Sequence, residues 1–294
     1  MARKPKMSQE DRRAYAVQMR AELESIMDRA YGAMVVSQEF WAEVLRTGAT
    51  LTDRSPINVV AVAAQLPGAT RILSSGDWRK VGRYPAKGST SIRIWTPIKR
   101  RPVETSDAAE APSGTEQAPA ETSARKVSGY KAGPVFDLSQ TDGDDYQAPA
   151  AVTLPVDVVR DTLAAQYREM YGEDPEAAEG FDGGRQVPDH AARILLYGHA
   201  WRRIAEVDAP MPGQHAAEVA SAAHVAALML GITPGEAVMP PLAGIVTGDK
   251  KPPVHGAVIR VIETGRAIAD AVMSGAAMCP AVADSDTRNL VTSG

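Results

Sequence analysis

The chain is poor in cysteine: its 294 residues include one, Cys279. A lone thiol cannot form an intramolecular disulfide or a cysteine-based metal cluster, so packing must stabilise the fold, and a reducing compartment fits. No apolar run approaches the roughly 18 residues that are needed to cross a membrane. The basic N-terminus, Met1 to Lys6, leads into a charged amphipathic segment and not into the apolar core of a signal peptide. The sequence therefore predicts a cytoplasmic protein that does not contact a membrane.

Aromatic residues are also scarce, at 5% of the chain, and three of the four tryptophans lie in the N-terminal third. The net charge of −4 hides an asymmetry in the same region. Residues 1–103 carry 18 Lys and Arg against 9 Asp and Glu, whereas the rest of the chain carries 14 against 27. This distribution favours an anion-binding N-terminal part. The alternative is that the basic residues form solvated helix faces and that the tryptophans are core anchors.

Apolar residues recur at helical spacing near the N-terminus and predict three helices. The first spans residues 9–30. The second follows Gly32 and stops near Gly48, with an apolar side formed by Val36, Phe40, Trp41, Val44 and Leu45. The third has Ser55 as its N-cap and Pro56 at its first position, and it stops at Pro67.

A change of period after residue 67 predicts short strands at residues 70–73, 91–95 and 133–139, with glycine turns between the first two. Pro97 is expected to end the second strand. Residues 103–128 are rich in Ala, Glu, Pro, Ser and Thr and lack aromatic residues, which predicts a disordered insertion. We interpret this insertion as a surface loop within one domain, residues 9–147, although a domain boundary there remains open.

Beyond residue 150 the pattern is helical, over residues 156–171, 188–206, 214–230 and 254–273. The third of these segments is rich in alanine, which suits close helix–helix contact. These helices define a second domain, residues 151–276, followed by a flexible tail, residues 277–294. The predicted fold class is α+β, with N-terminal helices packed on a small antiparallel sheet and a mainly helical C-terminal domain.

An ordered set of motifs runs through the N-terminal part. Its members are Ser55-Pro56-Ile57-Asn58, residues 78–83, Lys87-Gly88, residues 92–97, Gly129-Tyr130-Lys131 and residues 135–141. Through them, residues 9–145 resemble the N-terminal single-stranded-DNA-binding domain of the ArdC family of antirestriction proteins, found on plasmids and phages. Pro85-Ala86 and the insertion depart from the pattern. The resemblance implies sequence-tolerant binding of single-stranded DNA by a protein of a mobile element or phage that protects DNA from host restriction.

The candidate DNA contacts are cations for the phosphates, tryptophans for unstacked bases and two amides on one helix face. They are Asn58, Gln65, Trp78, Arg79, Lys80, Arg83, Lys87, Arg93, Trp95, Lys99, Arg100 and Arg101. Polar residues near helix ends often make local hydrogen bonds instead, so a purely structural role for the two amides stays open. Gly82 and Gly88 are interpreted as turn residues.

In relatives of this family the C-terminal domain resembles a zinc metallopeptidase with a His-Glu-x-x-His helix. In this chain Leu195 stands at the first His and Leu196 at the general base, and only His199 remains, while Ala220 stands at the downstream ligand. The resemblance therefore implies a degenerate metallopeptidase-like domain that lacks its active site, with neither catalysis nor a cofactor.

Two further hypotheses stay open for the C-terminal part. One is a zinc-dependent peptidase with a rearranged site made from His199, His215, Glu218 and His224. The other is an interaction scaffold that is tethered to DNA and whose acidic helices, residues 188–230, bind a protein partner.

Overall fold

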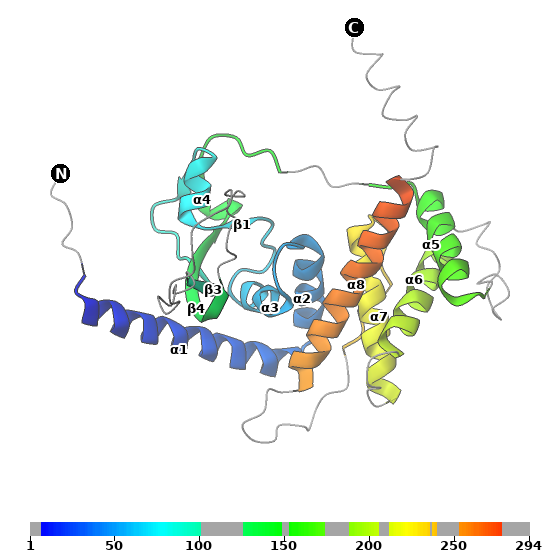
Figure 1. Cartoon of the computed structure of the whole chain (residues 1–294), viewed down its shortest axis with the longest axis horizontal. Coiled ribbons are helices and arrows are strands. Elements are labelled where there is room, and N and C mark those ends of the chain that lie inside the picture. Colours follow the sequence, from blue (N-terminus) through cyan, green and yellow to red (C-terminus); the bar gives the residue numbers. More distant parts are fainter. Residues whose placement is uncertain are drawn as a thin grey trace, which may run out of the picture.

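The computed structural model describes residues 7–100, 126–148, 153–173, 188–205, 212–235, 237–239 and 253–277. Within these ranges the chain forms eight α-helices and two small antiparallel sheets, so the predicted α+β class is confirmed. Figure 1 shows the sheets and α1 at one end, α2 and α3 in the middle, and α5 to α8 at the other end. None of the helices in the described part of the chain is long and apolar enough to cross a membrane.

The three N-terminal helices begin at serine caps, as sequence chemistry predicts. Ser8 caps α1 (Gln9–Met34) through its hydroxyl and the Asp11 N–H. Ser37 caps α2 (Gln38–Thr50), and Ser55 with Pro56 begins α3 (Pro56–Gln65). The expected place of Val36 on the apolar side of the second helix is wrong: Val36 precedes the cap of α2 and is 76% exposed.

Three strands form the main sheet, in the order β1 (Ile72–Leu73), β4 (Lys126–Asp137), β3 (Ile92–Arg100). The expectation that Pro97 ends the second strand is wrong, because β3 continues through it with a shift of register between Pro97 and Lys99. Residues 126–128 belong to β4 and not to the predicted insertion. The rest of that insertion, residues 103–125, lies outside the described residues.

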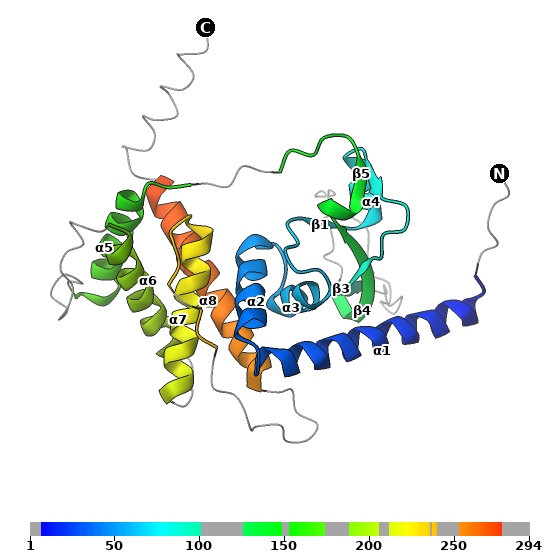
Figure 2. The same cartoon turned by 180° about the vertical axis from the view of Figure 1, so that it is seen from behind.

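A second sheet and a short helix occupy the segment that the sequence predicts only as turns. Here α4 (Ser75–Lys80) precedes β2 (Arg83–Pro85), which pairs with β5 (Thr141–Gly143). Figure 2 shows β5 beside α4, at the end of the sheet away from the C-terminal helices. Gly82 and Gly88 have φ angles of 75° and 90°, so their prediction as turn residues is confirmed.

The C-terminal helices are α5 (Val156–Tyr171), α6 (Pro188–Ala205), α7 (Pro212–Met229) and α8 (Pro253–Ala277), close to their predicted bounds. The small residues of α7 let α8 approach closely. A Cβ atom on Gly265 would lie 2.7 Å from the carbonyl oxygen of Ala222 and 2.7 Å from the Cβ of Val225. Of the predicted tail, Ala277 ends α8, and residues 278–294 lie outside the described residues.

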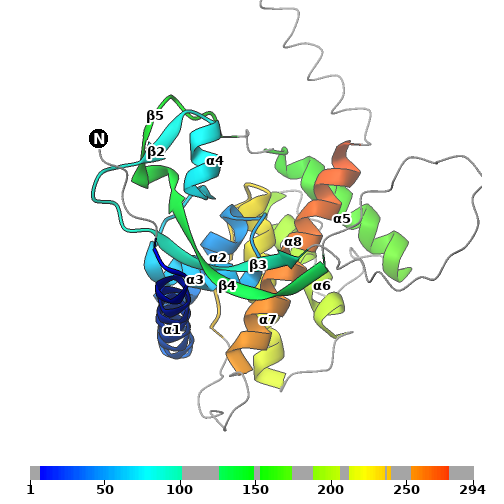
Figure 3. The same ribbon diagram turned by 60° about the vertical axis from the view of Figure 1, so that its left-hand side comes forward.

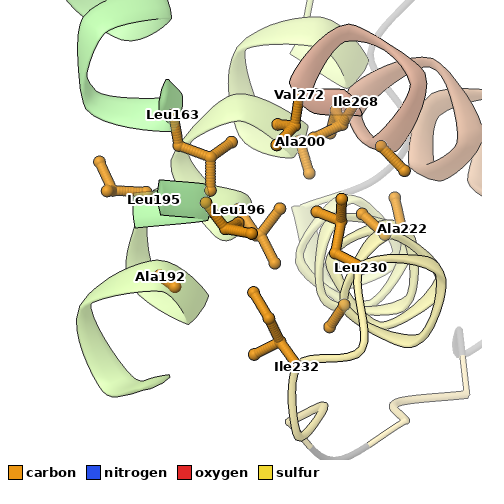
Figure 4. Packing of buried hydrophobic residues seen from close by; sticks show 14 of the residues in the cluster. Leu163, Ala192, Leu195, Leu196, Ala200, Ala222, Leu230, Ile232, Ile268 and Val272 are labelled. Atoms are coloured by element: carbon orange, nitrogen blue, oxygen red, sulfur yellow. The ribbon is translucent and has the colours of Figure 1, made fainter. Parts of the chain in front are cut away.

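Two large hydrophobic cores hold the molecule together. Figure 4 shows part of the C-terminal core, in which Leu163, Leu196 and Ile268 meet from α5, α6 and α8. The other core joins α1, α2 and α3 to Val258, Val261 and Ile262 of α8. The segments that the sequence predicts as two domains, residues 9–147 and 151–276, thus share one core.

Polar contacts reinforce this junction. The Arg266 guanidinium of α8 donates hydrogen bonds to the carbonyl oxygens of Gly48, Leu51 and Arg54, at 2.6–3.0 Å. The carbonyls of Gly48 and Leu51 lie at the end of α2, where helices leave acceptors without partners, and that of Arg54 lies in the following turn. The Trp41 indole N–H also donates to the Ser221 hydroxyl of α7 at 3.0 Å.

Candidate nucleic-acid interface

The two predicted amide contacts, Asn58 and Gln65, bind the protein's own sheet. The Asn58 side-chain NH2 donates to the Trp95 carbonyl oxygen at 2.9 Å, and its oxygen accepts from the Trp95 N–H at 2.8 Å. Gln65 makes the same pair of bonds to the carbonyl oxygen and N–H of Arg93, at 2.8 and 2.9 Å. Helix α3 thus replaces a neighbouring strand along the free edge of β3. The structural role of these two amides is the one the geometry supports, and their assignment as DNA contacts is corrected.

The two tryptophans assigned to base stacking are anchored in the fold. Trp78 is fully buried, and its indole N–H donates to the Phe136 carbonyl oxygen at 2.8 Å, so it presents no ring surface to a base. Trp95 is half-buried against the N-terminal core, with the Arg20 guanidinium 5.7 Å from its ring centroid. The assignment of Trp78 is therefore corrected to a core anchor, and Trp95 has little free ring surface.

The cationic turn around α4 and β2 is partly neutralised by neighbouring groups. Lys80 lies 2.7 Å from a carboxylate oxygen of Asp77, and this hydrogen bond, followed by one from Ser74, holds the Asp77 pKa below its ordinary value. The Arg83 guanidinium donates to the hydroxyl and carbonyl oxygens of Thr141 and to the carbonyl oxygen of Asp144. These hydrogen bonds tie Arg83 to β5 and give it a structural role, while its assignment as a phosphate contact stays a prediction.

Exposed carboxylates also surround this turn. Asp142, Asp144 and Asp145 follow one another on and after β5, which pairs with β2. Arg79 and Lys87 remain exposed, but they lie in a region where carboxylates are as numerous as cations. The turn is therefore a poor phosphate-binding surface.

Arg93 belongs with the structural residues as well. Its side chain is only 17% exposed, lies 3.4 Å from a Glu22 carboxylate oxygen of α1 and donates to the Ser91 hydroxyl at 3.2 Å. The contact ties α1 to the sheet. Its assignment as a phosphate contact stays a prediction. Arg101 lies outside the described residues.

The register of the far half of the β3–β4 pair places basic residues opposite or next to one another that the linear sequence separates. We call residues 96–100 and 126–131 the cationic ribbon. Its register places Thr96 opposite Lys131 and Arg100 opposite Lys126, and Lys99 lies next to Arg100. Neither segment contains an Asp or Glu. Figure 3 shows these two strands side by side as one long curved ribbon.

Tyr130, opposite Pro97, provides an exposed ring on the cationic ribbon and is 58% exposed. Sequence reasoning did not assign Tyr130, Lys131 or Lys126 to the site. The Gly129-Tyr130-Lys131 motif is a visible signal, but the pairing with Thr96–Arg100 spans the long insertion and cannot be derived from local spacing.

His199, which the resemblance places at the second histidine of a zinc motif, is a buried packing residue. Its Nε2 lies 2.9 Å from the Leu163 carbonyl oxygen, and the Tyr167 ring meets it edge-on at 5.3 Å. Burial lowers the His199 pKa, outweighing the hydrogen bond to Leu163, which raises it. Leu195 and Leu196 point into the C-terminal core (Figure 4).

The other residues of the hypothetical rearranged zinc site are engaged elsewhere. Glu218 is fully buried and binds Arg260 at 2.6 and 2.8 Å, and His224 Nδ1 lies 2.8 Å from the Gly235 carbonyl oxygen. His215 packs against the Trp201 ring, with centroids 4.3 Å apart. Across the described ranges, no three His, Cys, Asp or Glu residues come together in a group that could hold a metal. The geometry gives the rearranged-site hypothesis no support.

Comparison with known proteins yields one solved structure. No protein-family model and no curated protein matches the chain. The metal-free crystal structure of the antirestriction protein ArdC from plasmid R388 aligns with a TM-score of 0.38 and 13% sequence identity, over 75% of this chain and 84% of that one. This likeness describes only the path of the backbone. At a TM-score of 0.38 it supports no conclusion about function.

Proposed function

We propose that the protein binds single-stranded DNA with little sequence preference through the cationic ribbon. The observation that supports this is the pairing register, which brings Lys99, Arg100, Lys126 and Lys131 onto one stretch of two strands without a carboxylate. In this proposal the protein acts by binding alone, in the cytoplasm and without a cofactor.

The preference for a single strand follows from Tyr130. Cations along a ribbon neutralise phosphates whatever the base sequence, and an exposed ring stacks on any unpaired base. Paired bases are stacked on one another inside a duplex and do not offer their faces to a side chain. Tyr130 is 58% exposed on the ribbon and is next to Lys131 in the alternation of β4, so its ring projects from the opposite face, and a strand bound by Lys131 reaches the ring by passing over the edge of the ribbon.

A finer proposal concerns the biological role. The motif order of residues 9–145 resembles the ArdC family, and on that ground we propose that the bound strand belongs to a plasmid or phage and is protected from host restriction. This part of the proposal rests on the resemblance and not on the ribbon.

Fluorescence anisotropy of the full chain with a labelled oligonucleotide tests the binding. We expect the double change Arg100→Ala with Lys131→Ala to weaken binding to all sequences alike, and to reduce the slope of log affinity against log salt by about 1.4 for two lost phosphate contacts. We expect Tyr130→Ala to weaken binding about tenfold, since stacking is worth about 1–3 kcal/mol per base, and Tyr130→Phe to keep the affinity.

The matched control is Arg79→Ala with Lys80→Ala, which removes two exposed cations from the carboxylate-rich turn. It should cost clearly less affinity than the ribbon variant. Failure of the unaltered protein to bind at low salt, or equal affinity for a duplex, would refute the proposal. A control that loses as much affinity as the ribbon variant would move the interface to the turn.

A further inference from the structure

A groove of about 460 Å³ lies between α6 and α7. Its described lining consists of His190, Arg193, Ile194, Leu196, Tyr197, Ala220, Ala223, His224, Ala227, Gly235 and Val238. The volume falls within the range of about 300–1,000 Å³ that is typical of ligand sites. The metallopeptidase resemblance places the general base at Leu196 and a zinc ligand at Ala220. Both residues line the groove, so its surface is apolar at these two positions.

The apolar surface continues out of the groove along α6. Tyr197 lines the groove, and one helical turn further on its ring stacks on Trp201, with centroids 6.3 Å apart and planes 26° apart. Both rings are well exposed, at 39% and 44%. Trp201 is held in place from α7 by the edge of the His215 ring. An occupant that covers these rings must be longer than the groove itself.

The polar groups at the groove favour a negatively charged occupant. Arg193 lines it and has no hydrogen bond or ion pair to any described residue. His190 also lines the groove, and the Nδ1–H of His224 donates to the Gly235 carbonyl oxygen, which holds that ring in place. Among the described lining residues there is no carboxylate to compete for these groups. A carboxylate beside Arg193 would gain a charge-assisted, bidentate hydrogen bond.

We propose that this groove binds a peptide segment of a partner protein, with apolar side chains on the alanine floor of α7 and a carboxylate on Arg193. The exposed Tyr197–Trp201 pair extends the contact beyond the groove, as expected for a chain segment and not for a small molecule. Peptide recognition in grooves commonly combines apolar anchors with a few charged contacts. The groove lies between α6 and α7, the two helices that the sequence predicts as a partner contact, but none of its described lining residues is acidic, and the site does not depend on DNA binding.

Titration of the full-length protein with a fluorescein-labelled peptide of leucine, alanine and glutamate tests the site, with the same peptide carrying lysine in place of glutamate as the control ligand. We expect the glutamate peptide to bind at least about tenfold more tightly, which corresponds to about 1.4 kcal/mol. Arg193→Glu should remove that preference. Ala223→Trp should fill the groove and abolish binding.

Far-ultraviolet circular dichroism establishes that each variant is folded. The matched control for Ala223→Trp is Met170→Trp, which adds a tryptophan on the exposed surface of α5. If Ala223→Trp fails to fold, the peptide preference of Arg193→Glu still tests the proposal. Equal binding of the two peptides, an unchanged preference in Arg193→Glu, or binding of a medium-chain fatty acid without any peptide binding would overturn the proposal. None of these variants should alter affinity for single-stranded DNA.

Discussion

At the scale of single residues, His199 shows that a histidine at a predicted zinc-motif position serves a structural purpose in this fold. A zinc ligand offers a ring lone pair to the metal, but Nε2 of His199 faces the Leu163 carbonyl oxygen, which only accepts hydrogen bonds. Nε2 must therefore carry the proton. The ring is 1% exposed between α5 and α6, so its neutral form is favoured and its pKa is lowered by burial.

The lowered pKa predicts a loss of stability in mild acid. Below a pH of about 6.5 the unfolded chain protonates His199 while the folded chain does not, so the free energy of unfolding falls as the pH drops, by at most about 1.4 kcal/mol per pH unit for each such histidine. Burial also lowers the pKa of His224, which adds to the slope. His199→Gln keeps a donor for Leu163 and removes one titration.

Urea unfolding between neutral pH and pH 5 measures this effect. The free energy of unfolding of His199→Gln should depend less on pH than that of the unaltered protein, while the exposed residue His190, changed to Gln, serves as the control. Identical pH dependence for His199→Gln and the unaltered protein would show that His199 is not the titrating group.

At the scale of elements, two amide side chains of α3 bind the edge of β3. The backbone groups that they bind are not available to a further strand. A free strand edge is a template for association with other chains. Asn58 and Gln65 satisfy the backbone groups of Trp95 and Arg93 on that side, and the seven-residue spacing that places both amides on one helix face makes this possible.

Replacing Asn58 with Leu tests this arrangement. The change leaves the N–H and carbonyl oxygen of Trp95 without their partners, so we expect a loss of about 2–4 kcal/mol in the free energy of unfolding for two unsatisfied backbone groups. Denaturant unfolding measures the loss. The affinity of the remaining folded protein for single-stranded DNA should be unchanged, and a parallel loss of affinity with retained stability would instead make Asn58 a DNA contact.

At the scale of the whole molecule, the N-terminal and C-terminal segments depend on each other. Trp41, Val44 and Leu45 of α2 share a core with Val258 and other residues of α8. Arg266, also on α8, donates hydrogen bonds to the Gly48 carbonyl oxygen near the C-terminal end of α2. Helix α8, near the end of the described chain, packs against α1, α2 and α3 in this core. We therefore expect the core to form only when both parts are present.

An isolated fragment of residues 1–148 should therefore fail to fold cooperatively. Each buried valine or leucine that loses its cover costs about 1.5–3 kcal/mol, and several such losses approach the stability of a typical domain, about 5–15 kcal/mol. Circular dichroism with thermal melting compares the fragment with the full chain, for which we expect a single transition. A fragment that melts cooperatively at the temperature of the full chain would establish residues 9–147 as an independent domain.

The sequence by itself determined the local features of this protein: the serine-capped helices, the helical C-terminal part and the glycine turns. These features depend on residues a few positions apart, where capping and periodicity act. Only the tertiary structure decided which charged and aromatic groups are accessible. Trp78 is buried in the fold, and the Arg83 and Arg93 side chains bind Thr141 and Glu22. The strand register places Arg100 opposite Lys126, on the other side of the insertion in the sequence. Burial and strand register depend on contacts between distant segments, which no local spacing encodes.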